Sequence, residues 1–272
     1  MKYKMIVSDF DNTLYGHTVS VTSKKAILEY IKKGGIFAIS TGRPYTSLKM
    51  TMSQFGLQNL DIFVMCYQGA TTQRQLTGEL IFEKKLANKI ALDWLKSVYR
   101  NYKNDNICIS MYAGEKMLVE KNAKQNLIKL TDENFQEVDS LVEYLQSSKM
   151  DLYKFCVIGD EHTLLSLQSQ VEREFANMQF CISHPNLLEV TSSHAGKGNM
   201  VSTLAQSLNI DLSSVICIGD NQNDISMLQC AGLGVAVGNA REDVKQCATL
   251  IAPDCDDDGV AYIINKAILG QL

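Results

Sequence analysis

Short apolar runs of strand length alternate with amphipathic stretches at both ends of the chain, and this alternation limits the possible folds most. KMIVSDF, GIFAIST and DIFVMCY are apolar almost throughout, and helix-like segments at residues 22–33 and 43–55 separate them. The C-terminal part repeats the pattern with SSVICIGD, NDISMLQCAG and LGVAVG. Strands that are apolar throughout are typical of parallel sheets covered on both faces. We therefore predict an α/β fold with a Rossmann-like, doubly wound parallel sheet.

The middle of the chain has a different pattern. QRQL-TG-ELIFEKKL and NICISMY-AGE-KMLVEK are typical of hairpins that turn at Thr77-Gly78 and Ala113-Gly114. Helical patterns follow near residues 87–101, 138–147 and 163–175, and MQFCIS and LLEVTS are strand-like. This mixture predicts an inserted α+β domain at residues 81–187, with the core formed by residues 1–80 and 188–272.

Composition excludes several classes of function. The 272 residues carry 26 basic and 30 acidic side chains, a net charge of −4, without a basic block. This balance argues against nucleic acid or an anionic membrane as partner. No apolar run approaches the 18 or so residues of a membrane span. None of the eight cysteines lies in a C-x-x-C, which argues against a structural zinc site and favours a cytoplasmic protein with reduced thiols.

Polar residues gather where the predicted core strands end. Ligands of parallel sheets bind outside the carboxyl ends of the strands, so side chains there are candidates for chemistry. Individually they have structural explanations: Thr41 as a helix cap, Lys197 as a solvated charge, Asp224 as a helix N-terminal acid. Together the candidates supply two acidic clusters, a hydroxyl and a lysine at strand ends or helix starts of one sheet. The candidates are Asp9, Asp11, Thr41, Gly42, Lys197, Asp220, Asn223 and Asp224.

The order of these motifs resembles that of a known superfamily. D-x-D-x-T, T-G-R-P, an isolated lysine and G-D-x-x-N-D follow one another as in haloacid-dehalogenase-like phosphatases, specifically the Cof-type subgroup with a type IIB cap. Two positions depart from the family pattern. Asn12 stands where glycine is usual, which is tolerable because Asn adopts left-handed backbone more readily than most residues. Gln68, in Y-Q-G-A, replaces the usual asparagine and puts that loop's substrate contact in question.

The resemblance implies a role for each candidate. Asp9 is expected to attack phosphorus and form an aspartyl phosphate, and Asp11 to act as general acid and base. Mg²⁺ is expected as cofactor, held by Asp9, the Asp11 backbone carbonyl and Asp220. Asp224 is expected to orient the metal shell or Lys197, with direct ligation left open. The phosphate ligands implied are Thr41, the Gly42 N–H, Lys197 and Asn223.

The expected activity is hydrolysis of small phosphorylated metabolites, with the cap as a lid that selects the leaving group. Sugar phosphates, nucleotides and phosphorylated cofactors all fit. A phosphomutase is the first alternative, because an aspartyl phosphate can pass to a second hydroxyl. A non-enzymatic, phosphate-responsive module is the second, because receiver domains combine similar groups around Mg²⁺. A dehalogenase is disfavoured, since carbon–halogen displacement has no use for the acid Asp11 supplies.

Overall fold

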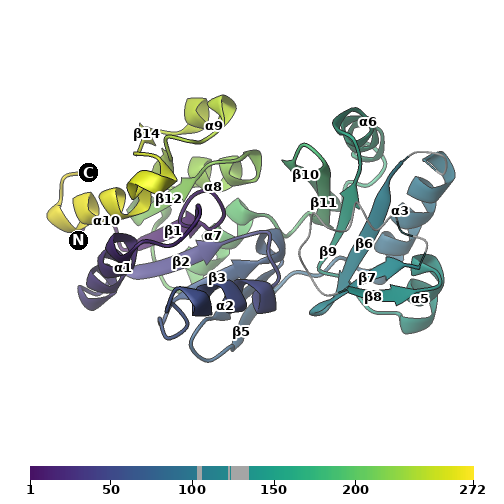
Figure 1. Ribbon diagram of the computed structural model, residues 1–272, viewed down its shortest axis with the longest axis horizontal. Coiled ribbons are helices and arrows are strands. Elements are labelled where there is room, and N and C mark those ends of the chain that lie inside the picture. The colour runs from purple at the N-terminus through teal and green to yellow at the C-terminus, as the bar shows by residue number, and fades with distance from the viewer. Residues whose placement is uncertain (103–105, 122, 124–134) are drawn as a thin grey trace. The chain divides into compact units, whose positions relative to one another are not determined.

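The computed structural model describes residues 1–102, 106–121, 123 and 135–272 (Figure 1). These residues form two compact units. The first, which we call the core unit, consists of Met1–Glu83 and Gly196–Leu272. The second, the inserted unit, consists of Lys84–Ala195. The core unit is therefore built from two separate segments of the chain.

An eight-stranded sheet in the order β14-β13-β12-β1-β2-β3-β4-β5 forms the centre of the core unit. Neighbouring strands are parallel from β14 to β3, and β4 and β5 add an antiparallel edge. Every residue of the central strands β1 and β12 is buried, so both faces of the sheet are covered, as predicted. The strands are β1 (Met5–Asp9), β2 (Ile36–Ser40), β3 (Phe63–Cys66), β4 (Thr71–Arg74), β5 (Leu80–Glu83), β12 (Val215–Gly219), β13 (Leu233–Ala236) and β14 (Leu250–Ile251).

Helices connect these strands, and α1 packs beside α10 while α7 packs beside α8 (Figure 1). The Ser20 side chain caps α1 by accepting a hydrogen bond from the Ser23 N–H, and so fixes where that helix begins. The helices are α1 (Val21–Lys32), α2 (Tyr45–Gln54), α7 (Lys197–Ser207), α8 (Ile225–Cys230), α9 (Glu242–Cys247) and α10 (Gly259–Leu269), with the short 3₁₀ turns η1 (Tyr67–Gly69), η3 (Leu212–Ser214), η4 (Gln222–Asp224) and η5 (Cys255–Asp257).

The inserted unit has a six-stranded sheet in the order β10-β11-β9-β6-β7-β8, antiparallel except between β7 and β8. Trp94 of α3 is fully buried, and its ring centroid lies 4.6 Å from that of Phe155, so it packs inside the core of this unit. The elements are β6 (Cys108–Ala113), β7 (Lys116–Glu120), β8 (Phe135–Val138), β9 (Lys154–Ile158), β10 (Met178–His184), β11 (Leu187–Ser192), α3 (Asn88–Asn101), α5 (Leu141–Ser148) and α6 (Glu161–Val171).

The two compact units divide at positions that differ from the domain boundaries expected from sequence, 80/81 and 187/188. β5 pairs with β4, so the core unit continues through Glu83, beyond the expected residue 80. β11 pairs with β9 and β10, so residues 188–195 belong to the inserted unit rather than to the core. Sequence pattern does not locate these boundaries, because the apolar residues of a strand do not specify which sheet the strand joins.

The cysteines form no disulfide bond in the structure. All eight are free, and four of them are buried: Cys66, Cys108, Cys156 and Cys217. Among the helices that the structure describes, none combines the length and the apolar character that crossing a membrane requires.

Candidate active site

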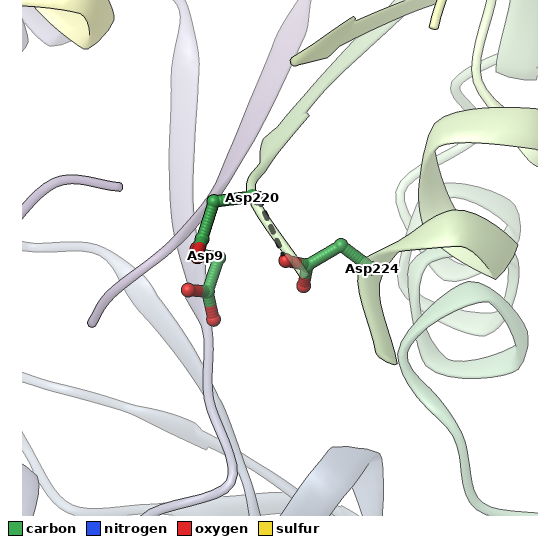
Figure 2. Close-up of side chains that lie close together, drawn as sticks. All are labelled: Asp9, Asp220 and Asp224. Atoms are coloured by element: carbon green, nitrogen blue, oxygen red, sulfur yellow. Dashed lines mark hydrogen bonds between the residues drawn. The ribbon is translucent and has the colours of Figure 1, made fainter. Parts of the chain in front are cut away.

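Three carboxylates meet where two neighbouring parallel strands of the core sheet end. Asp9 is the last residue of β1, and Asp220 directly follows the adjacent strand β12. Asp224 ends the η4 turn that comes next. Oxygen atoms of these three buried residues lie within 4.8 Å of one another, and Figure 2 shows their side chains close together. We call this group the carboxylate cluster.

Lys197 lies within this cluster and is almost completely buried, with a side chain 1% exposed. Its Nζ atom donates to Asp9 Oδ1 and to Asp224 Oδ1, each at 2.5 Å. Burial alone disfavours the charged ammonium, but the adjacent carboxylates outweigh it and raise the pKa of Lys197 above its usual value. The structure thus rules out a solvated surface charge and leaves a lysinium shared between two aspartates.

The Asp224 carboxylate has partners at both oxygens. Oδ1 accepts from Lys197, and Oδ2 accepts from the backbone N–H groups of Asp220 and Asn221 at 2.9 Å and 3.0 Å. Gly219 permits this approach, because a Cβ atom there would lie 2.5 Å from the Asp224 Cβ. The geometry therefore favours Asp224 as the residue that orients Lys197 and the Asp220 loop.

Asp220 accepts a 2.7 Å hydrogen bond at Oδ1 from the hydroxyl of Thr13. Sequence reasoning gave Thr13 no role, although it is the threonine of the D-x-D-x-T motif. Burial, with a further contribution from the Asp224 charge, raises the pKa of Asp220 to about 6. Burial and the same neighbour raise the pKa of Asp9 well above its usual range.

These raised pKa values test whether a metal ion fits the site. Burial is their main cause, and repulsion from neighbouring carboxylates, which outnumber the one lysinium, adds to it. A divalent cation would supply the missing positive charge, and a donor set made of carboxylate oxygens suits Mg²⁺. The residues present therefore fit the predicted ion.

Asp11 lies outside the carboxylate cluster and pairs with an arginine. Arg43 Nε lies 2.9 Å from Asp11 Oδ2, and Arg43 Nη2 lies 2.5 Å from Asp11 Oδ1. The guanidinium carbon is 5.5 Å from the ring centroid of Phe10 and 5.7 Å from that of Tyr15. Asn12 follows with a φ of 58°, the left-handed conformation expected where glycine is usual. The sequence did not predict the role of Arg43 as partner of Asp11.

The remaining candidates lie on loops of the same sheet edge. Thr41 follows β2, is buried, and accepts the Arg43 N–H at its hydroxyl, with Gly42 between the two residues. Asn223 lies in η4, and its Nδ2 atom donates to Gln68 Oε1 at 3.1 Å. The structure thus brings the predicted phosphate-binding residue Asn223 together with Gln68, one of the two positions that depart from the family pattern.

Comparison with known proteins gives the family of this arrangement. A profile of the haloacid dehalogenase-like hydrolases matches residues 6–264. The chain belongs to this family. A relative from Bacillus subtilis, 5-amino-6-(5-phospho-D-ribitylamino)uracil phosphatase YwtE, is 25% identical over 293 residues, covering 98% of this chain and 99% of its own. The expected enzyme class, a phosphoric monoester hydrolase of this family, is confirmed at this level.

Solved structures agree with the family fold. A haloacid dehalogenase-like hydrolase from Bacillus subtilis superposes with a TM-score of 0.85 at 25% identity, covering 96% of this chain and 99% of its own. The subclass IIB sugar phosphatase BT4131 superposes with a TM-score of 0.82 at 20% identity, covering 99% and 100%, and supports the fold alone. The predicted architecture, a doubly wound core with an inserted α+β cap, is confirmed.

Proposed function

We propose that this protein is a Mg²⁺-dependent phosphatase that hydrolyses small phosphate monoesters through an aspartyl phosphate on Asp9. The observation that carries the proposal is Lys197, buried and bound at once to Asp9 and Asp224 beside Asp220. Such a lysinium is placed to neutralise phosphate oxygens next to the nucleophile. Family membership supports the same chemistry.

In the first step, a carboxylate oxygen of Asp9 forms a bond to phosphorus while the bond from phosphorus to the leaving-group oxygen breaks. Asp11 donates a proton to that oxygen, and the product alcohol leaves. In the second step, Asp11 takes a proton from water as the water oxygen attacks the aspartyl phosphate. The phosphorus–Asp9 bond then breaks and inorganic phosphate is released.

The phosphoryl oxygens carry the charge that moves during both steps, so their ligands matter most. Lys197 is the charged donor, while the Thr41 hydroxyl, the Gly42 N–H and the Asn223 amide are the neutral donors. Asp224 keeps Lys197 in place. Asp9, the Asp11 backbone carbonyl and Asp220 would hold Mg²⁺, which when bound supplies positive charge against the carboxylates and the substrate phosphate.

We propose the inserted unit as the part that selects the leaving group. The support is family resemblance, together with its separate sheet and hydrophobic core. The relative YwtE acts, by its name, on a phosphoribitylamino pyrimidine. Phosphate esters of sugars, sugar alcohols and nucleosides are therefore the first substrates to test. We also place the enzyme in the cytoplasm, a prediction that rests on its eight free cysteines.

The decisive experiment is release of inorganic phosphate from p-nitrophenyl phosphate in the presence of Mg²⁺. We expect many turnovers per enzyme molecule, loss of activity with EDTA, and recovery on adding Mg²⁺. Phosphorylation that stops after one equivalent, or activity indifferent to chelation, would overturn the proposal. A screen of phosphorylated metabolites ranked by kcat/KM then identifies the substrate class.

A further inference from the structure

Three consecutive residues after β3 have left-handed backbone. Tyr67, Gln68 and Gly69 have φ values of 53°, 57° and 82°. This conformation is unfavourable for residues with a side chain and persists where the surroundings enforce it. Position 69 also has no room for a side chain, because a Cβ atom there would lie 2.7 Å from the carbonyl oxygen of Gly196. The turn is therefore pressed against the residue that precedes Lys197.

The backbone of Gln68 joins two loops of the candidate site. Its N–H donates to the carbonyl oxygen of Thr41 at 3.1 Å, and its carbonyl oxygen accepts from the Gly196 N–H at 2.8 Å. The first contact fixes the start of the loop that follows β2, and the second fixes the start of α7, where Lys197 is the first residue. A right-handed residue at position 68 would direct these two groups elsewhere.

The side chain of Gln68 reaches a third loop. Its Oε1 atom accepts from Asn223 Nδ2 at 3.1 Å. The Oδ1 atom of Asn223 is buried and has no partner among the residues that the structure describes. The Gln68 contact is thus the one described side-chain hydrogen bond that sets the orientation of the Asn223 amide. A primary amide has two N–H donors, so the second remains for a phosphate oxygen.

We propose that Gln68 is a positioning residue that aims the Asn223 amide nitrogen at the phosphoryl group, rather than a residue that reads the leaving group. This inference rests on the proposed function, because it takes Asn223 to be a phosphate ligand. It explains how the chain accommodates glutamine where the family usually has asparagine. The backbone of Gln68 adopts the left-handed turn, and the longer glutamine side chain reaches η4 with its amide oxygen.

The test uses inorganic phosphate as the probe, since phosphate has no leaving group. Binding to the Mg²⁺-loaded, full-length protein is measured by calorimetry for Gln68→Met, Gln68→Gly, Asn223→Ala and the Gln68→Met/Asn223→Ala pair. Methionine keeps the length of the side chain but removes the acceptor. Glycine removes the side chain and adopts positive φ without strain. Gln54→Ala, an exposed glutamine on α2 of the same unit, is the matched control.

We expect phosphate affinity to fall roughly tenfold in both Gln68 variants, which is the loss typical of one hydrogen bond. The double variant should bind no more weakly than Asn223→Ala alone, because both changes remove the same interaction. Gln68→Gly should melt at or above the wild-type temperature while losing affinity, a combination that a purely structural role does not produce. Gln54→Ala should match the wild type in both measurements.

Three results would overturn the inference. One is wild-type phosphate affinity in Gln68→Met when Asn223→Ala binds weakly. Another is additive loss in the double variant, which would show that Gln68 acts without Asn223. The last is an affinity loss confined to esters and absent for free phosphate, which would make Gln68 a leaving-group contact. If Asn223→Ala itself binds phosphate normally, the phosphate site in the proposed function fails as well.

Discussion

The Arg43 guanidinium binds the Asp11 carboxylate through two nitrogens, at 2.9 Å and 2.5 Å, while its third nitrogen, Nη1, binds the Thr51 hydroxyl at 2.9 Å. The planar fork of arginine thus fixes the direction of the Asp11 carboxylate. To act as the proposed acid, Asp11 carries a proton on one oxygen in place of its arginine contact, while the other oxygen still accepts from Arg43. The Thr51 contact anchors the arginine on α2 in turn. The position of Asp11 therefore depends on the loop that follows β2.

Replacing Arg43 with lysine should slow the reaction in a way that depends on the leaving group. Lysine cannot bind a carboxylate with two parallel donors, so Asp11 loses its fixed direction. We expect kcat to fall about tenfold for alkyl phosphates and much less for p-nitrophenyl phosphate, whose leaving group needs no proton. Arg74→Lys, which changes the surface pair Arg74–Asp61, is the control. Equal losses on both substrates would contradict the role given to Arg43.

The nucleophile assignment predicts the outcome of Asp9→Asn. An amide oxygen does not attack phosphorus, so turnover should fall by roughly a thousandfold or more, while substrate still binds in calorimetry. Asp211→Asn, an exposed aspartate before η3, should leave kcat unchanged. Substantial residual turnover in Asp9→Asn would remove Asp9 as nucleophile.

Asp11→Asn should slow the enzyme most on poor leaving groups, because its proton assists departure of the alcohol. A plot of kcat against leaving-group pKa should become steeper in the variant than in the wild type. Identical slopes would show that Asp11 does not transfer this proton. Because Arg43→Lys should steepen the same plot to a smaller degree, the two variants together separate proton donation from its positioning.

The raised pKa of Asp220 predicts how pH and Mg²⁺ together affect the thermal stability of the protein. Its pKa is raised from 3.8 to about 6 in the folded protein. Between these values the native state binds more protons than the unfolded state, so the contribution of this carboxyl to stability falls as pH rises. Mg²⁺ needs the deprotonated form, so the increase in Tm on adding Mg²⁺ should grow from about pH 5 to about pH 7.5.

Two variants sharpen that measurement. Asp220→Asn should remove the Mg²⁺-dependent increase in Tm and raise the Tm of the metal-free protein near pH 7.5, because a buried charge disappears. Asp224→Asn should retain most of the Mg²⁺-dependent increase, since Asp224 binds Lys197 and two backbone N–H groups. A Mg²⁺ effect that does not change with pH, or that is lost equally in both variants, would contradict these assignments.

Breaking the buried pair of Lys197 and Asp224 should also destabilise the fold. Asp224→Ala leaves two backbone N–H groups without an acceptor and reduces the charge opposite a buried lysine. We expect the free energy of unfolding in urea to fall by about 3 kcal/mol. Asp211→Ala, at an exposed position, should change it by less than about 0.5 kcal/mol. Similar effects in the two variants would contradict this reading of the pair.

The sequence predicted the core strands well because β1, β2, β3 and β12 are continuous apolar runs, a signal that does not depend on distant residues. It did not predict β8 or β9. β8 is largely exposed, and β9 lies between β6 and β11, so partners distant in sequence specify it as a strand. The same dependence on partners explains why the two compact units divide after β5 and after β11, a few residues beyond the boundaries expected from sequence.

The candidate site shows a similar division. Motif order predicted which residues gather at the sheet edge, and the structure brings Asp9, Lys197, Asp220 and Asp224 together. The hydrogen bonds that orient the site side chains were not predicted. Thr13 reaches Asp220 across 207 residues and Asn223 reaches Gln68 across 155, so each depends on rotamers that only the folded chain defines.

The insertion between β5 and α7 has a consequence for biosynthesis. β1 lies between β2 and β12, and β12 is translated only after the entire inserted unit. The inserted unit therefore has all its strands available on the ribosome while one edge of β1 still lacks its neighbour, a state prone to wrong pairing. Asp9 meets Lys197, 188 residues later in the chain, only after the whole inserted unit has been translated. A nascent chain thus carries its nucleophile long before it can assemble the site that uses it.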